Sequence, residues 1–156
     1  VEQLEFLGRQ IRDTERYLAA FARGNPAVKL LQTIPGVGIR TAEAVVAYID
    51  KPERFRHGRQ VGTYFGLVPS QDQSGGRNHL GRITREGPGT ARRLLAEAIW
   101  VGIRHDERIK AKFEQVRHDD PQRRKIAVIA TARWLVTVMH AMLRTGEAWR
   151  KHPAAA

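Results

Sequence analysis

The 156-residue sequence contains no cysteine. Disulfide bonds and thiolate metal sites are therefore excluded, and nothing indicates an oxidising compartment. The six histidines are scattered without ligand-like spacing. No stretch approaches the roughly 20 apolar residues of a membrane-spanning helix, and the first residues do not form a charged-then-apolar leader. These absences favour a cytoplasmic protein without a membrane partner.

Acidic residues are also few. The 16 Asp and Glu stand against 27 Lys and Arg, which gives a formal net charge of +11. Such an excess can mean a solvated surface or a face that meets anionic lipid, but its natural partner is a polyanion such as DNA or RNA. The length fits one domain with or without a helical extension, and it is too short for two independent enzymes.

The spacing of apolar residues predicts an all-α fold. We expect helices at about 1–23, 28–49 (two helices and a tight turn), 59–65, 88–104, 107–116 and 121–144, with the last as the central core helix. Residues 66–89 hold many glycines and few apolar residues, so we expect a long Gly/Arg-rich loop or irregular ribbon. Trp100, Trp134 and Trp149 are predicted to be packing residues.

The first helix carries a heptad seam of apolar residues. This spacing suits either a coiled coil or a helix that lies on its own domain. We expect three parts: a linker or coiled-coil helix at 1–24, a main domain at 25–150 and a tail at 151–156. The seam consists of Leu4, Leu7, Ile11, Leu18 and Phe21, with Thr14 filling the remaining position.

Residues 28–49 match a helix-hairpin-helix, with Pro35, Gly36, Val37 and Gly38 in the turn. Gly36 and Gly38 allow positive φ and bring bare backbone N–H groups close to a phosphate. These groups begin a helix whose dipole attracts anions, and Arg40 adds charge. We therefore predict phosphate binding without base readout. The alternative is that these glycines only form a compact corner between two helices.

The glycine-rich segment has a strongly one-sided charge. Guanidinium groups suit phosphate oxygens, and Ser74 precedes Gly75 and Gly76, which allow close backbone approach. From the residues alone, a Ser-Gly-Gly sequence is more often a flexible turn than a nucleophile site. Between Ser74 and Leu95, only Glu86 opposes the arginines Arg77, Arg82, Arg85, Arg92 and Arg93.

The ordered set of motifs resembles the C-terminal domain of transposases of insertion-sequence family 110, with its 1111 branch. The resemblance covers about residues 28–148. The motifs that carry it are Ile34 to Gly38, Gly66 to Pro69, Ser74 to Gly76, Gly81 to Arg85 with Gly87, Arg92 to Leu95, and Arg144 to Gly146.

This resemblance implies a DNA recombinase in which Ser74 is the nucleophile, while Ser70 does not match the Ser-Gly-Gly pattern. It places Mg²⁺ in a RuvC-like domain with an Asp-Glu-Asp-Asp set, which is absent from this chain, so we expect the chain to be a fragment that is inactive alone. A guide RNA encoded by the element and a homo-oligomeric active complex are also implied. No metal ligands are expected here; metal-dependent cleavage by this chain alone would direct attention to Asp72, Glu86, Asp119 and Asp120.

Two other functions remain open. A non-catalytic helix-hairpin-helix module for DNA or junctions would use the Ser74 segment only to touch phosphate. A dimerisation module would act through the seam of the first helix. The arginine-rich segment favours the transposase over a simple binding module, because such a module does not need it.

Overall fold

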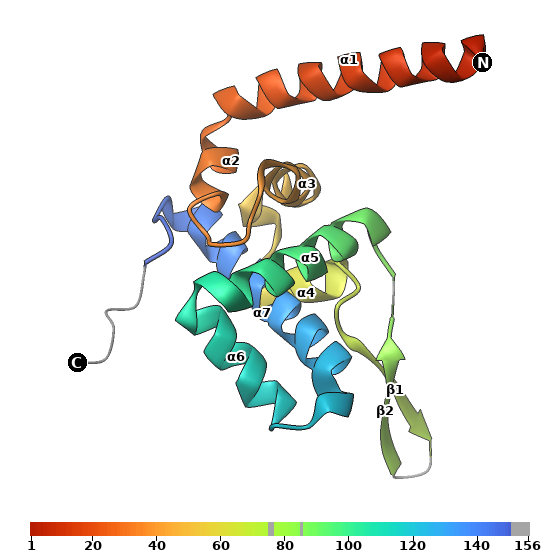
Figure 1. The fold of residues 1–156 in the computed structure, drawn as a ribbon. Helices are drawn as coiled ribbons and strands as arrows, with labels where there is room; N and C mark the ends of the chain where they lie inside the picture. Colours follow the sequence, from red (N-terminus) through yellow and green to blue (C-terminus); the bar gives the residue numbers. More distant parts are fainter. Residues whose placement is uncertain (75–76, 85, 151–156) are drawn as a thin grey trace.

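The helix boundaries of the computed structural model follow local sequence signals (Figure 1). Asn25 accepts a hydrogen bond from the Ala27 N–H and so caps the helix that starts at Pro26. Gly146 ends the last helix in the left-handed conformation (φ 73°). The structure describes residues 1–74, 77–84 and 86–150, and of residues 70–74 and 77–82 it describes only the backbone. The helices are α1 (Glu2–Gly24), α2 (Pro26–Leu31), α3 (Ile39–Ile49), η1 (Pro52–Arg54), α4 (Gly58–Tyr64), α5 (Gly89–His105), α6 (Glu107–Arg117), η2 (Pro121–Arg123) and α7 (Arg124–Thr145).

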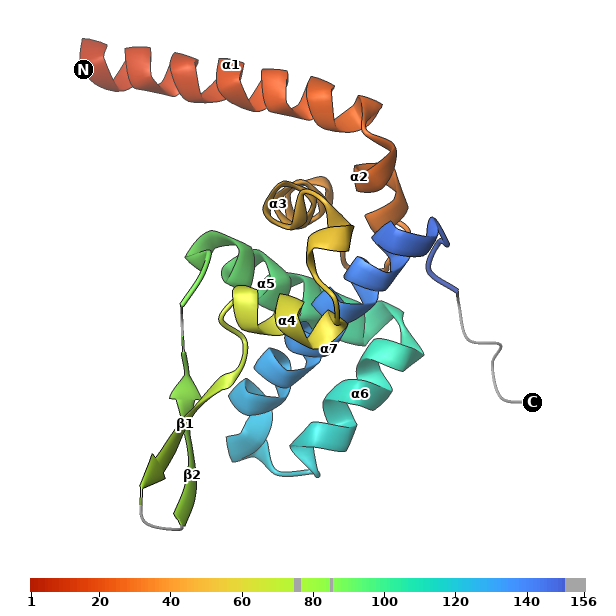
Figure 2. The same ribbon diagram turned by 180° about the vertical axis from the view of Figure 1, so that it is seen from behind.

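The all-α class is confirmed, but the segment expected to be a loop contains a β-hairpin. Strand β1 (Pro69–Ser74) pairs antiparallel with β2 (Arg77–Ile83). In Figures 1 and 2 this hairpin extends away from the helices. The strands escaped prediction because they are rich in Gln, Asp, Asn and Gly, which are poor strand formers, and show no apolar alternation.

Helix α7 is the core helix, as predicted, and packs against α4, α5 and α6 (Figure 2). Residues 121–145 are long and apolar enough, at a mean hydropathy of 1.7, to cross a membrane by length and composition. The expectation that no stretch approaches such a helix was therefore wrong. Half of that apolar window is buried inside the domain, so its composition is explained by core packing.

Two glycines bring α4 close to α7. A Cβ at Gly58 would lie 2.6 Å from Cγ2 of Thr137, and one at Gly62 would lie 2.8 Å from Cγ of Arg133. The Thr137 hydroxyl donates to the Gly58 carbonyl at 3.3 Å. The four-residue spacing puts both glycines on one face of α4, and this face lets the stem of Arg133 lie across the helix.

The end of the domain is fixed by Trp149, which is buried as predicted. Its indole N–H donates to Oδ2 of Asp106 at 2.8 Å, and its backbone N–H donates to the Thr33 hydroxyl at 3.0 Å. The other carboxylate oxygen of Asp106 caps α6 by accepting from two backbone N–H groups. One buried side chain thus joins the C-terminal segment to α6, while Thr33 joins it to the corner after α2.

Helix α1 projects from the rest of the domain (Figure 1). Its contacts are with α2 and α3, where Arg40 Nη2 donates to the Glu15 carbonyl at 3.4 Å. The apolar seam is exposed along its whole length: Leu4 75%, Leu7 54%, Ile11 59%, Leu18 45% and Phe21 71%. The seam therefore does not lie on its own domain.

Candidate nucleic-acid interface

The corner between α2 and α3 holds the two glycines predicted to approach phosphate, and they occupy different environments. Gly36 has a φ of 89°, and a Cβ there would lie 2.6 Å from the Ala98 carbonyl oxygen and 2.6 Å from the Gly102 nitrogen. Glycine is thus required at position 36 by contact with the backbone of α5. The side of Gly36 where a Cβ would lie thus faces α5, and the approach of its backbone N–H to a phosphate stays a prediction.

Gly38 faces open space. A Cβ there would meet nothing within 4 Å, and its φ of −78° is ordinary, so the positive φ predicted for Gly38 was wrong. Gly38 is the exposed N-cap of α3, and no side chain caps this helix. Because the first N–H groups of an α-helix have no partner within the helix, the start of α3 offers uncapped donors together with the positive end of the helix dipole.

Arg40, the predicted cation beside this helix start, contacts other protein groups. Its Nη1 donates to Oε2 of Glu43 at 3.1 Å, in addition to the contact with α1. This partly exposed ion pair is weak and screened by solvent. Arg40 therefore braces α1 and α3, and its role in nucleic-acid binding stays a prediction.

Ser74 is the last residue of β1, where the hairpin turns, and it pairs with Arg77 at the start of β2. The backbone of Arg82 also lies in β2. Gly75, Gly76 and Arg85 lie outside the described residues, as do the side chains of Ser74, Arg77 and Arg82. The backbone of Ser74, the predicted nucleophile, thus lies at the end of a projecting strand.

The hairpin joins the helices through a narrow neck that the sequence did not predict. Gly66 has a φ of 64° and Gly87 a φ of 135°. A Cβ at Gly66 would lie 2.6 Å from the Glu86 carbonyl oxygen, and one at Gly87 would collide with the Tyr64 carbonyl oxygen. The chain entering the hairpin therefore touches the chain leaving it, backbone against backbone, as only glycine allows.

Arg92 closes this neck. Its Nη1 donates to the Phe65 carbonyl at 3.3 Å and to the Gly87 carbonyl at 2.9 Å, so one guanidinium bridges both sides. This arginine was predicted to bind phosphate, and the structure gives it a contact that holds the hairpin. The next arginine, Arg93, pairs with Glu97 at 3.4 Å on the exposed surface of α5.

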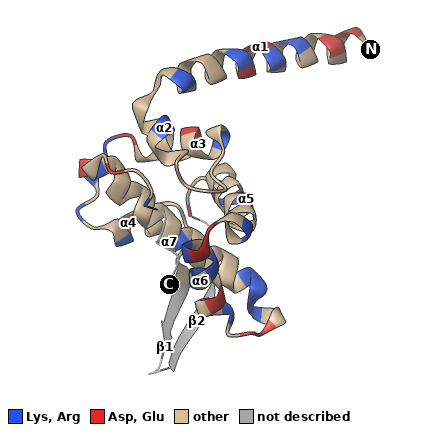
Figure 3. Ribbon diagram, turned by 60° about the vertical axis from the view of Figure 1, so that its left-hand side comes forward, with Lys and Arg blue, Asp and Glu red and all other residues tan. Residues whose placement is uncertain are grey.

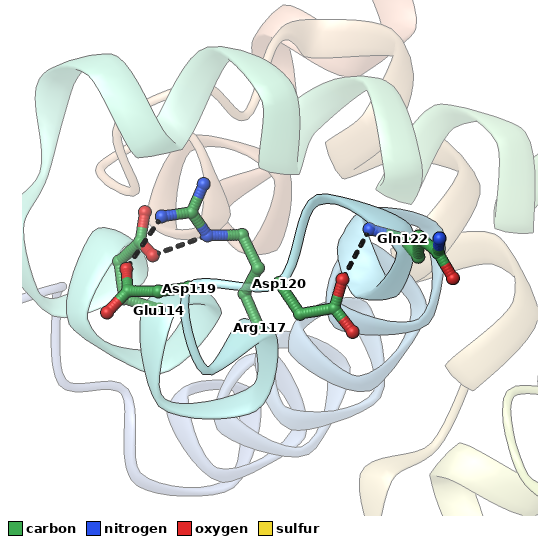
Figure 4. A network of polar contacts seen from close by, with 5 residues as sticks. All are labelled: Glu114, Arg117, Asp119, Asp120 and Gln122. Atoms are coloured by element: carbon green, nitrogen blue, oxygen red, sulfur yellow. Dashed lines mark hydrogen bonds and ion pairs between the residues drawn. The ribbon is translucent and has the colours of Figure 1, made fainter.

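Two of the carboxylates considered as fallback metal ligands stabilise the corner between α6 and α7 (Figure 4). Arg117 donates to Glu114 at 2.7 Å and to Asp119 at 3.1 Å, while Asp120 accepts from the Gln122 backbone N–H at 2.8 Å. Within the described ranges, no three His, Asp or Glu side chains gather as a metal site would require.

Positive charge is distributed over the helices and is not confined to the corner of α2 and α3 (Figure 3). The chain is therefore a basic all-α domain with a protruding β-hairpin. Its candidate contacts with nucleic acid are the uncapped start of α3 and the hairpin. The model of the transposase IS116/IS110/IS902 family matches residues 28–114. The chain belongs to this family.

Three curated relatives with similar sequences are named as transposases. A probable family 20 transposase of Pseudomonas aeruginosa is 36% identical over 103 residues, which are 66% of this chain and 30% of the relative. The transposase for insertion sequence element IS1111A of Coxiella burnetii is 37% identical over 103 residues, 65% of this chain and 28% of the relative. A putative transposase of Sinorhizobium fredii, y4pF/y4sB, is 27% identical over 148 residues, 93% of this chain and 38% of the relative. The chain thus matches well under half the length of each.

Proposed function

We propose that this chain is the DNA-binding and strand-exchange domain of a transposase, with Ser74 as its nucleophile. The observation that carries the proposal is the position of Ser74 in a member of this family: it ends β1 on a hairpin whose neck is fixed by Gly66, Gly87 and Arg92. A nucleophile must reach into a DNA backbone and still be held in a defined direction. A projecting strand meets both needs when the neck of its hairpin is fixed by backbone contacts.

In the proposed step, the Ser74 hydroxyl oxygen attacks a phosphodiester phosphorus. The new Oγ–P bond forms as the bond from phosphorus to one sugar oxygen breaks, and that oxygen leaves with a proton as a sugar hydroxyl. The proton of the serine hydroxyl passes to a general base. Strand exchange is the reverse reaction with a hydroxyl from another DNA end, so no external energy source is needed.

The proposal assigns the metal chemistry to a RuvC-like domain outside this chain, where Mg²⁺ would stabilise the charge on the phosphate oxygens. A guide RNA encoded by the element is proposed as a second polyanionic partner, consistent with the net charge of +11. The proposed site of this activity is the cytoplasm of a bacterium or archaeon.

The grip on duplex DNA is proposed to be the helix-hairpin-helix, through the start of α3. Gly38→Asp tests this because its two effects have opposite signs. An aspartate at an N-cap accepts from the first N–H groups and stabilises a helix by about a few tenths of a kcal/mol relative to the glycine it replaces. The same carboxylate repels phosphate and occupies its donors. We expect the variant to fold at least as stably as the parent and to bind duplex DNA about tenfold or more weakly in fluorescence anisotropy.

Gly24→Asp is the matched control, since Gly24 is exposed, has nothing within 4 Å of its Cβ position and lies on α1. It makes the same change in net charge. Equal affinities for the two variants would show that the corner of α2 and α3 is only a structural turn. Parent binding should also weaken steeply with added salt, since each neutralised phosphate releases counterions.

The active complex is proposed to be a homo-oligomer joined through the exposed seam of α1. At 1.5 Å per residue, this 23-residue helix is about 34 Å long, enough for three heptads. A paired copy would bury the seam side chains that are exposed in the single chain. The arginines Arg9, Arg16 and Arg23 recur every seven residues on the opposite side, where they would stay in water.

Sedimentation of two matched variants tests this pairing. Leu7→Glu with Ile11→Glu puts two charges into the seam and should convert a dimer into a monomer at micromolar concentrations, because like charges would face each other in an apolar interface. Arg9→Gln with Arg16→Gln lowers the net charge by the same amount on the opposite side and should leave the dimer intact. A parent chain that sediments as a monomer would end the proposal.

A further inference from the structure

A groove lies beside the neck of the hairpin. It lies between α4, α6 and α7, has a volume of about 490 Å³, and is lined by Val68, the residue just before β1. The Val68 carbonyl accepts from the Thr84 N–H at 2.9 Å, which extends the hairpin pairing to the edge of the groove. The groove is therefore continuous with the hairpin.

Three cations from three helices meet in this groove: Arg59 from α4, Lys112 from α6 and Arg133 from α7. Among the described residues, none of them has a carboxylate within ion-pair distance. The Arg133 stem is held in place because it lies over Gly62. Three cations that line one groove without a carboxylate partner raise its positive potential, so the groove is suited to phosphate.

The rest of the lining is not that of a simple anion site. Val68, Val116 and Ala130 supply apolar surface, and the half-buried Trp134 adds an aromatic ring whose position is fixed by edge contact with Trp149 at 6.1 Å between centroids. Cations along a backbone track, together with an aromatic ring and an apolar floor for bases, are the elements by which proteins hold single-stranded nucleic acid. The volume is that of a small-molecule site, sufficient for individual nucleotides and too small for a double helix.

We propose that this groove binds an unpaired DNA strand that leads to Ser74. This rests on the proposed function, because it takes the strand attacked at the hairpin to be the occupant. The chain advances by six residues from Val68 to Ser74, about 20 Å of extended strand, so the bound strand needs only a few nucleotides to run from the groove to Ser74. Phosphates of the strand contact the three cations, and one or more bases lie against Trp134 and Val116.

Charge removal tests the proposal. The triple variant Arg59→Gln, Lys112→Gln and Arg133→Gln should bind a short single-stranded oligodeoxynucleotide about 10- to 100-fold more weakly, and the slope of log affinity against log salt should fall by about 2, at about 0.7 per phosphate contact. The control triple Arg16→Gln, Lys110→Gln and Arg144→Gln makes the same change in net charge at exposed positions elsewhere, and its affinity should fall less than about threefold. Irradiation of an oligonucleotide carrying 5-iodouracil should crosslink the parent chain within α6 or α7 at the groove.

Because Arg133 also packs on α4, the double variant Arg59→Gln with Lys112→Gln leaves that stem in place and should lower the salt slope by about 1.4. Equal losses in the two triples would overturn the groove as a specific site. So would a loss confined to RNA of the same sequence, which would make it an RNA site. If the parent chain binds duplex DNA and the groove triple variant binds the single strand as tightly as the parent does, the groove proposal is wrong and the proposed function stands. A parent chain that binds no DNA would contradict both proposals.

Discussion

Gly36→Ala should strongly destabilise the domain, with a loss in unfolding free energy of about 2–5 kcal/mol. Two costs add. An L-residue in the left-handed region costs about 1–2 kcal/mol, and the φ at this position is 89°. Forcing extra volume into a packed contact costs a further 1–3 kcal/mol, and here the new Cβ would lie 2.6 Å from backbone atoms of Ala98 and Gly102, which cannot rotate away. Such a loss is a large part of the stability of an ordinary domain.

Urea unfolding followed by circular dichroism measures the loss in unfolding free energy. In thermal unfolding, the melting temperature should fall by about 10 °C. Gly38→Ala is the matched control two residues away, where the Cβ meets open space at an ordinary φ, and its stability should change by less than about 0.5 kcal/mol. If the two variants are equally stable, the contact between this corner and α5 is not what fixes glycine at position 36.

The difference between these two glycines shows what the sequence was able to predict. The pattern located the corner correctly, because a Pro-Gly-Val-Gly run between two amphipathic segments has a local signature. It gave both glycines the same role and did not predict the contact that requires glycine at position 36. That contact is with α5, more than sixty residues away, and no local pattern reports that Gly36 lies against Gly102.

The arginines give the same lesson for the site. Arg40 and Arg92 are predicted phosphate ligands, and the fold shows that both also contact protein carbonyls. Composition reports how many cations exist, while their partners depend on which backbone oxygens the fold brings near. The cations of the groove, Arg59, Lys112 and Arg133, were missed because they lie far apart in the chain and meet only where α4 and α6 both pack on α7.

The helices themselves were predictable because their determinants are local. Periodic apolar residues, an N-cap before Pro26 and a glycine after Thr145 each act within a few residues. The neck of the hairpin was not, although glycines at 66 and 87 flank the segment symmetrically. Each of these glycines is required because the segment on the other side of the neck contacts it. The requirement therefore depends on a contact between residues far apart in the sequence.

Ser74→Ala in the full-length transposase should reduce DNA strand cleavage and exchange by about four orders of magnitude or more, as loss of a covalent nucleophile does in other enzymes. Alanine removes the one oxygen able to form the bond to phosphorus. Position 74 is the end of a strand, outside the helical core, so folding and DNA affinity should stay near the parent values. A supercoiled donor and target in one reaction, scored for recombinant junctions, gives the measurement.

Ser70→Ala is the control within the same strand, four residues nearer the neck, and it should recombine at close to the parent rate. A covalent protein–DNA adduct, trapped during the reaction and mapped by mass spectrometry, should carry the nucleotide on Ser74. Recombination by the Ser74→Ala protein at the parent rate would show that Ser74 is not the nucleophile and leave the chain as a non-catalytic helix-hairpin-helix binding module.

The 156-residue chain alone should not cleave DNA with Mg²⁺ present, because the metal-binding carboxylates are proposed to lie in another domain. Robust metal-dependent cleavage by this chain would contradict that assignment even if Ser74 carried the adduct.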